Sequence, residues 1–244
     1  MTNEDIKNHV GNIIEKTFNM LQYVYYKSQG SDAAIEKMPE KPKKPTRIIF
    51  PNYSNDKDKL RLSEQELRCL FIEQLNAYCD SDEGKEASSW QYSVETPTTK
   101  KYNFSDKDHL IVSPNDESSQ IDMASEDGSA NKTVESARID LVIHDENKEP
   151  IALIEFKALN PGKFCFEKDF FKLKHESQGT HCPTFFVMFV ENHRNDTIKH
   201  LHEKIETKDK NTEFYCYSFN EEEHRIEARI EESQPTDQTE QPNV

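Results

Sequence analysis

The sequence lacks any apolar run that approaches the roughly 20 residues needed to span a bilayer, and its polar start has no signal-peptide core. Its five cysteines are scattered and form no C-x-x-C pair, so neither a zinc cage nor a disulfide framework is expected. We therefore expect a cytoplasmic protein with reduced thiols and no membrane partner. Apolar residues are also scarce, at 34% of 244 residues, which is below the usual globular share.

Basic residues are also few compared with acidic ones. Lys and Arg number 31 against 46 Asp and Glu, which gives a formal net charge of -15. This balance excludes a generally basic nucleic-acid coat, whose affinity would rest on phosphate neutralisation, but it leaves a locally basic groove open. Fourteen Phe and nine Tyr are enough for a core, so we expect one compact domain with acidic appendages.

Hydrophobic patterns divide the chain into four parts. Residues 1–30 carry apolar residues at helical spacing, and residues 31–59 form a Pro/Lys-rich linker. Residues 60–230 form the main domain, with a mobile acidic loop near 113–132 that is almost free of aliphatic residues. Residues 231–244 are expected to be a disordered acidic tail.

The main domain alternates between helical and strand periodicity. Ser63 and Glu66 have the spacing of a capping box at the start of its first helix, and Pro97 is expected to end its first strand. Weaker patterns predict strands over 109–112, 214–219 and 225–230 and a helix over 198–205. The principal order is helix 63–79, strand 90–96, strand 137–144, strand 151–159, helix 164–177 and strand 184–191.

One group of charged residues stands inside strand patterns. Asp140 lies in the first strand of a predicted hairpin, and Glu155 and Lys157 lie two residues apart in the second, on one face. A turn centred on Asn147 and Lys148 pairs residues whose numbers add up to 295, so Asp140 faces Glu155. Directly paired residues of an antiparallel ladder have Cβ atoms about 5 Å apart.

Two carboxylates at this distance can share one divalent cation through oxygen. Lys157 adds a compact positive charge that can stabilise the charge developing during phosphoryl transfer. Uncompensated acids inside apolar strands would cost several kcal/mol each, which favours a functional reason for them. The alternative is a solvated sheet face on which Lys157 forms an ion pair with Glu155 or Asp140.

The order of elements, together with four sequence blocks, resembles the PD-(D/E)XK (restriction-endonuclease-like) nuclease superfamily, and in particular bacterial members of uncertain function. The resemblance implies an α/β fold whose αβββαβ core has a mixed central sheet flanked by helices, here preceded by an N-terminal helix. The resemblance covers roughly residues 60–205. The chain lacks the Pro of the Pro-Asp dipeptide of the motif, because Ile139 precedes Asp140. The blocks are RIDLVI at 138–143, IEFKA at 154–158, YSVETPT at 92–98 and EKDFFKL at 167–173.

This resemblance implies hydrolysis of phosphodiester bonds in nucleic acid with Mg²⁺ or Mn²⁺ as the cofactor. DNA is the expected substrate, in DNA processing or phage defence. By the same resemblance, Asp140 and Glu155 are metal ligands and catalytic residues, and Lys157 is the catalytic lysine.

Further charged residues extend this candidate site. The first helix of such proteins often supplies another carboxylate; Glu66 and Glu73, seven apart on one stripe, are the candidates, and Glu64 and Glu95 stay open. Capping for Glu66 and plain surface exposure for Glu73 are the competing interpretations. Three lysines near the helix over 164–177 are candidates for contacts with neighbouring phosphates, although solvation of that helix explains them equally well: Lys163, Lys168 and Lys172.

Two other functions stay open. A catalytically inactive member of the same fold would act as an acidic interaction module for a basic partner, and an acidic DNA mimic would present carboxylates spaced like phosphates. Net charge favours these two, whereas the set of Asp140, Glu155 and Lys157 favours the nuclease. Because an acidic chain repels nucleic acid, an activating protein partner or a homodimer is also expected.

Overall fold

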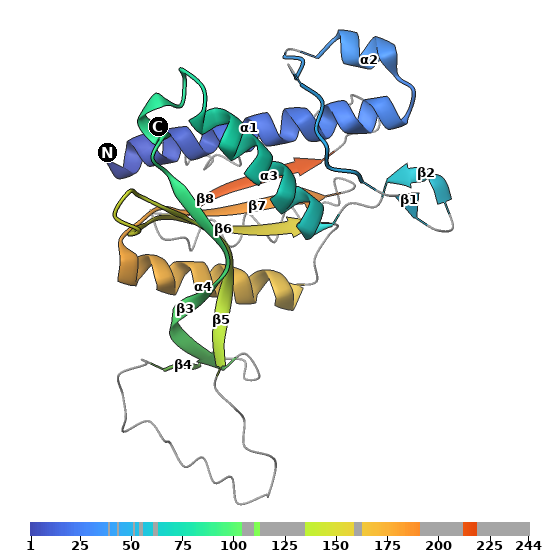
Figure 1. Cartoon of the computed structure of the whole chain (residues 1–244). Helices are drawn as coiled ribbons and strands as arrows, with labels where there is room; N and C mark the ends of the chain where they lie inside the picture. The colour runs from blue at the N-terminus through green and yellow to red at the C-terminus, as the bar shows by residue number, and fades with distance from the viewer. Residues whose placement is uncertain are drawn as a thin grey trace, which may run out of the picture.

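A six-stranded sheet stands at the centre of the computed structural model (Figure 1). Its strand order is β4–β3–β5–β6–β7–β8; the strands from β4 to β6 pair antiparallel, and β6, β7 and β8 run parallel. The protein therefore has a mixed α/β fold with a mixed sheet. The strands are β3 (Gln91–Asn103), β4 (Leu110–Val112), β5 (Glu135–His144), β6 (Pro150–Ala158), β7 (Thr184–Val190) and β8 (Thr212–Ser218).

Three helices cover the two faces of this sheet. α1 (Asn3–Ser28) and α3 (Glu64–Cys79) lie on one face, and α4 (Lys163–Thr180) lies on the other (Figure 1). The smaller elements are α2 (Asp32–Glu36), a 3-10 turn (Lys85–Ala87), and a hairpin of β1 (Asn52–Tyr53) and β2 (Asp56–Leu60). The structure describes residues 1–38, 40–42, 44–50, 52–53, 56–60, 63–103, 110–112, 135–158, 163–190 and 212–218.

Specific signals define both ends of α1. The Thr2 hydroxyl accepts from the Asp5 N–H at 3.2 Å, and the Asp5 carboxylate accepts from the Thr2 N–H at 2.9 Å, which forms a capping box. At the other end Gly30 has φ +63°, and the Ser31 N–H donates to the Tyr26 carbonyl at 2.9 Å. This Schellman-type termination explains why the helix stops where it does.

The apolar face of α1 belongs to the main core. Val10 and Ile14 are fully buried, and the ring of Phe18 contacts the rings of Phe189 in β7 and Tyr217 in β8. Burial of one such side chain contributes about 1.5–3 kcal/mol. The helix predicted within 1–30 is therefore an integral part of the domain.

β6 is buried on both faces, and ionisable residues interrupt one of them. Ile154 and Phe156 pack on the side of α1 and α3, whereas Leu153 packs on the side of α4. The two-residue period of a strand places Glu155 and Lys157 on the same side as Leu153. Both are buried, with 1% and 7% exposure. Charged side chains thus take positions at which the pattern of the strand would place apolar ones.

β3 continues past Pro97, so the prediction that the strand ends there is wrong. Pro97 keeps its place in the β3–β5 register, and the strand extends to Asn103. The buried Glu176 carboxylate of α4 accepts from the backbone N–H groups of Thr99 at 2.9 Å and Lys100 at 3.2 Å. A side chain of the facing helix therefore satisfies donors that an interrupted ladder would leave unpaired.

Other sequence predictions differ from the structure or lie beyond it. The segment 31–59, predicted as a linker, contains α2 and nearly all of the β1–β2 hairpin, which ends at Leu60. Ser63 is the N-cap residue of α3 as predicted, but its hydroxyl makes no capping hydrogen bond within the described part of the chain. Within the ranges that the structure describes, none of the helices is a candidate for a membrane span. Four predicted segments lie outside the described residues: 113–132, 198–205, 225–230 and 231–244.

Candidate functional site

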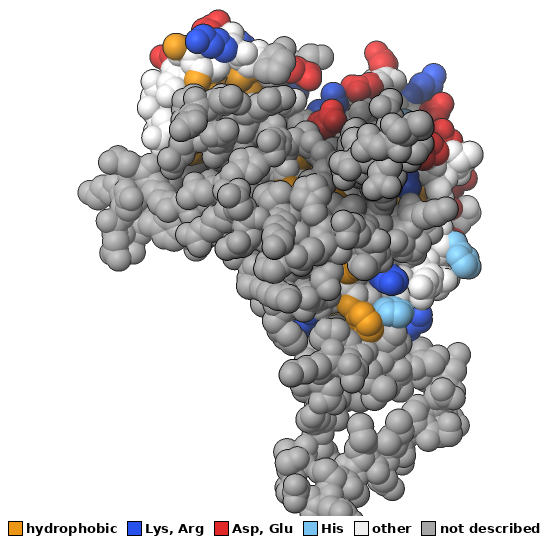
Figure 2. Space-filling model, turned by 180° about the vertical axis from the view of Figure 1, so that it is seen from behind, with side chains coloured by type: hydrophobic (Ala, Val, Ile, Leu, Met, Phe, Trp, Pro, Cys, Tyr) orange, Lys and Arg blue, Asp and Glu red, His pale blue; other side chains and the backbone are white. Residues whose placement is uncertain are grey.

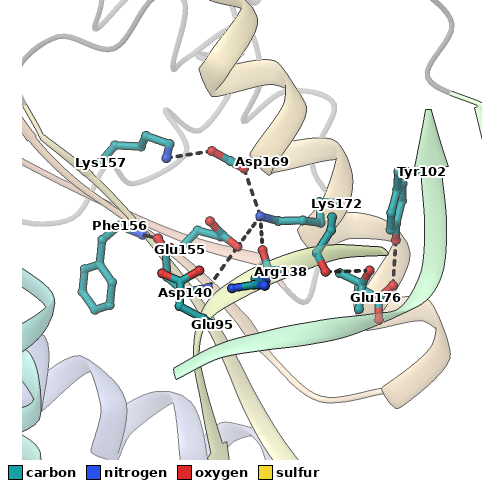
Figure 3. Close-up of polar contacts among 12 residues, drawn as sticks. Glu95, Tyr102, Arg138, Asp140, Glu155, Phe156, Lys157, Asp169, Lys172 and Glu176 are labelled. Atoms are coloured by element: carbon teal, nitrogen blue, oxygen red, sulfur yellow. Dashed lines mark hydrogen bonds and ion pairs between the residues drawn. The ribbon is translucent and has the colours of Figure 1, made fainter. Parts of the chain in front are cut away.

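The β5–β6 hairpin has the register that the sequence predicts. Residues 141–143 pair with partners whose numbers add up to 295, whereas His144 pairs with Pro150 after an irregularity beside the turn. The position next to the Leu141–Ile154 pair places Asp140 opposite Glu155. The Asp140 N–H donates to Oε1 of Glu155 at 3.4 Å, and the Phe156 N–H donates to Oδ2 of Asp140 at 2.8 Å (Figure 3). Asp140 and Glu155 therefore lie side by side across the two strands, and the carboxylate of each accepts from a backbone N–H of the other strand.

β3 adds a third carboxylate to this row. The neighbours of Glu95 pair with Leu141 and Ile139, so Glu95 lies opposite Asp140 on the other side of β5. Glu95 has φ +50°, a left-handed conformation that is uncommon for a residue with a side chain. Such local strain is a reason to look for function at this position.

Arg68 of α3 connects Glu95 to Asp140. Its guanidinium forms an ion pair with Glu95 and lies 3.7 Å from Oδ1 of Asp140. It also donates to the Gln65 side chain at 2.5 Å. The side chain of Arg68 is 10% exposed, whereas that of Asp140 is 20% and that of Glu95 is 43% exposed. The carboxylates of this row are therefore most exposed to solvent at Glu95 and become more buried toward Glu155.

Glu155 is the most deeply buried acid of the row. Its Oε1 lies 2.7 Å from Nζ of Lys172 on α4. Burial raises the pKa of Glu155 well above its ordinary value; Lys172 opposes this shift, and Asp140 and Asp169 reinforce it. A negative charge on Glu155 therefore needs a positive charge beside it.

Asp169, three residues before Lys172 on α4, contacts both lysines of the site. Its Oδ1 lies 3.0 Å from Nζ of Lys172, and its Oδ2 lies 2.7 Å from Nζ of Lys157 (Figure 3). Burial disfavours the charged carboxylate, but the two lysines outweigh burial and lower the pKa of Asp169 below its ordinary value. Asp169 is therefore ionised at neutral pH.

Lys157 lies between a buried carboxylate and an exposed one. Its Nζ is 2.7 Å from Asp169 and 3.4 Å from Glu64 in the first turn of α3. Burial opposes the charged ammonium, but Asp169 and Glu64 outweigh it and raise the pKa of Lys157. The Glu64 side chain is 47% exposed, so it is the partner that an incoming group can replace more easily.

These contacts form one continuous cluster of charges that joins α3, the sheet and α4. Five carboxylates face three cations, which gives the cluster a formal charge of -2 when all are ionised. Oxygen ligands with this excess charge suit a hard divalent cation such as Mg²⁺ or Mn²⁺. The carboxylates are those of Glu64, Glu95, Asp140, Glu155 and Asp169, and the cations are Arg68, Lys157 and Lys172.

The cluster fits a cation that is held by few protein ligands. Within the described ranges, no group of three or more His, Cys, Asp or Glu side chains is arranged to enclose a metal. Asp140 and Glu155 nevertheless present neighbouring carboxylates, and Mg²⁺ commonly binds through one or two carboxylates while it keeps several waters. Asp140 and Glu155 therefore suit a divalent cation that keeps several of its water ligands.

The two carboxylates predicted as ligands from the first helix, Glu66 and Glu73, differ in what the structure shows of them. Oε2 of Glu73 accepts from the Thr46 hydroxyl at 2.9 Å, away from the cluster, so its prediction as a ligand is wrong. Glu66 follows Glu64 by two residues, which places it about 200° around the helix from the side chain that reaches Lys157. Glu64 is the α3 carboxylate that contacts Lys157, and the choice of Glu66 as a ligand stays a prediction.

The three predicted phosphate-binding lysines differ in their positions. Lys172 is 4% exposed and bound to carboxylates inside the cluster, so its predicted place on a phosphate-facing surface is wrong. Lys168 is half-buried on α4. Lys163 begins α4, and its side chain lies outside the described part of the structure.

Sequence reasoning missed Asp169 and Arg68 as members of the site. A spacing signal existed for both. Asp169 and Lys172 are three apart and share a helix face, and Glu64 and Arg68 are four apart and share another. Neither spacing says which face meets the strands, so the sequence alone did not select them.

Comparison of the chain with protein-family models, with curated proteins and with solved structures gives no match.

Proposed function

We propose that this protein is a divalent-cation-dependent nuclease that hydrolyses phosphodiester bonds, with the arrangement of the PD-(D/E)XK superfamily. The observation that carries the proposal is the meeting of Asp140 and Glu155 across the β5–β6 register, with Lys157 two residues beyond Glu155. The order α3–β3–β4–β5–β6–α4–β7 supports it, because apart from the short edge strand β4 it matches the αβββαβ order of that core. The mixed sheet with helices on both faces also agrees with the proposal.

Asp140 and Glu155 are the residues that would hold Mg²⁺ or Mn²⁺. When bound, the cation supplies positive charge that polarises a phosphoryl oxygen and lowers the pKa of water. The Phe156 N–H, at 2.8 Å from Oδ2 of Asp140, fixes the direction of that carboxylate. Glu64 is close enough to Lys157 to orient its ammonium from the solvent side.

Lys157 acts in this proposal as a permanent positive charge. Its raised pKa keeps the ammonium protonated, so it stabilises negative charge and does not accept a proton. Asp169 is its closer and more buried partner and holds the chain in place. A substrate phosphate would replace Glu64, the more distant and more exposed partner.

Binding of nucleic acid by this chain is expected to be weak. In the view of Figure 2, the described Lys and Arg side chains are scattered, some beside Asp and Glu and others beside His, and do not form one basic patch. Because Lys172 lies inside the cluster, few lysines remain to contact phosphates. The logarithm of the binding constant, plotted against the logarithm of the salt concentration, is therefore expected to have a slope no steeper than about -3. We propose that an activating protein partner or a second copy supplies further contacts.

The direct test is incubation of the purified protein with plasmid, linear duplex DNA, single-stranded DNA and RNA, in Mg²⁺, Mn²⁺ or EDTA. We expect hydrolysis that requires the cation and is lost in Lys157→Ala. Lys85→Ala, which removes an exposed lysine of the 3-10 turn, is the matched control and keeps the activity. Cleavage that survives in EDTA, or equally in Lys157→Ala, contradicts the proposal.

A second candidate function is a non-catalytic interaction module, and one observation favours it. Each of the three cluster cations already has a carboxylate within 4.0 Å, so the cluster is neutralised to a large extent without any metal. In that case no substrate is cut under any cation, and Lys157→Ala changes stability alone. The two functions are therefore separated by the same incubation.

A further inference from the structure

The ammonium of Lys172 lies inside a set of oxygen atoms from three different elements. It is 2.7 Å from Oε1 of Glu155 in β6, 3.0 Å from Oδ1 of Asp169 in α4, and 2.5 Å from the Arg138 carbonyl oxygen in β5 (Figure 3). Lys172 is 4% exposed. Three oxygen acceptors around one buried cation satisfy all three donors of an ammonium.

This position matters because Glu155 is a residue proposed to hold the divalent cation. The carboxylate is 1% exposed, and a buried charge without a partner is costly. Lys172 supplies the partner while no divalent cation is bound. Once a cation with two positive charges binds the same carboxylate, the ammonium beside it is repelled, because like charges at about 4 Å oppose each other strongly in a protein interior.

We propose that Lys172 is a built-in counter-ion that occupies Glu155 in the metal-free protein and is displaced when a divalent cation binds to Asp140 and Glu155. Asp169 gives the displaced ammonium a partner, because it already contacts Lys172 from the same helix. Lys172 therefore competes with the cation, and it weakens cation binding while it stabilises the metal-free fold. The proposal rests on the proposed metal site, but it concerns affinity and not cleavage.

The test compares Mn²⁺ binding by isothermal titration calorimetry, without nucleic acid, in the full-length wild type and in Lys172→Met. Because the competing charge is lost and the volume is nearly kept, Lys172→Met should bind Mn²⁺ at least about tenfold more tightly, which is about 1.4 kcal/mol. The matched control is Lys174→Met, which removes a half-buried lysine two residues further along α4. It should bind Mn²⁺ as the wild type does.

A second variant tests the proposal even if Lys172→Met does not fold. Lys172→Gln keeps a donor for Glu155 but removes the charge, so it should also bind Mn²⁺ more tightly than the wild type. Lys172→Met should melt at a lower temperature than the wild type without metal, and the added Mn²⁺ should raise its melting temperature more. Unchanged or weaker Mn²⁺ binding in Lys172→Gln or in folded Lys172→Met overturns the displacement.

The cleavage assay separates this inference from the proposed nuclease. Wild-type cleavage together with unchanged Mn²⁺ affinity in the Lys172 variants overturns the counter-ion role and leaves the nuclease standing. Tighter Mn²⁺ binding in the variants without any wild-type cleavage supports the counter-ion role and overturns the nuclease. Absence of Mn²⁺ binding from the wild type and from both Lys172 variants overturns the counter-ion role as well.

Discussion

Replacing Asp169 by asparagine perturbs the ion-pair cluster at its centre. The carboxylate contacts Lys157 at 2.7 Å and Lys172 at 3.0 Å, and the two lysines are 7% and 4% exposed. The substitution keeps the size of the side chain and removes its charge. Both ammonium groups would then remain buried with less negative charge around them.

The size of the effect follows from these contacts. Removing one partner of a buried ion pair typically costs about 3–5 kcal/mol. Lys157 keeps Glu64 and Lys172 keeps Glu155, so we expect the lower end, about 3 kcal/mol. For a chain of this length that loss lowers the melting temperature by roughly 6–12 °C.

The pH dependence of this loss has a definite sign. The pKa of Asp169 in the folded protein is lowered, because Lys172 and Lys157 outweigh burial. The charged carboxylate therefore contributes stability above the unfolded pKa of about 3.9, and that contribution is lost as the pH falls through the folded pKa. The difference in the free energy of unfolding between the wild type and Asp169→Asn should have its full size at pH 7 and should decrease below about pH 4.

Urea unfolding at several pH values measures this difference directly. Glu146→Gln, at an exposed turn position, is the matched control and should change the free energy of unfolding by less than about 0.5 kcal/mol. A loss below about 1 kcal/mol in Asp169→Asn, or a loss that does not change in acid, would refute the buried ion-pair cluster.

Two further predictions concern the frame that holds the site. Glu176→Gln should lower the free energy of unfolding by about 2–3 kcal/mol in urea, because the buried carboxylate accepts hydrogen bonds from Thr99, Lys100 and Tyr102; a neutral result would contradict its role in extending β3. Deletion of residues 1–30 should abolish cooperative unfolding followed by circular dichroism, because α1 supplies buried side chains to the main core; a truncated chain that still melts cooperatively would show that α1 is dispensable.

The sequence predicted the register of the hairpin at the site from two local rules. The alternating pattern gave the two strands, and a turn around Asn147 gave the register found at the site, although the structure also has an irregularity between Ile143 and His144 that the pattern did not predict. Lys157 followed from its spacing to Glu155. These features depend on neighbours in the chain, and no long-range docking is needed to derive them.

The rest of the site depends on how helices dock on the sheet, which spacing alone does not determine. The apolar stripe of α3 was visible, but its rotation decides that Glu64 and Arg68 reach the strands while Glu73 turns to Thr46. The helical pattern predicted Lys172 as a surface lysine, whereas the docking of α4 on the sheet brings it into contact with Glu155. The end of β3 was misplaced for the same reason, since Glu176 on α4 supports the strand beyond Pro97.

The measurement that tests the central claim most directly compares Asp140→Asn with Glu73→Gln for Mn²⁺ response and for hydrolysis of nucleic acid. Both variants convert a carboxylate to an amide, but only Asp140 faces Glu155. We expect saturating Mn²⁺ to raise the melting temperature of the wild type and of Glu73→Gln by roughly 5–10 °C, and both to cut nucleic acid. Asp140→Asn should lose both responses. An Asp140→Asn protein that keeps the Mn²⁺ response and the cleavage would contradict a metal site on this pair of carboxylates.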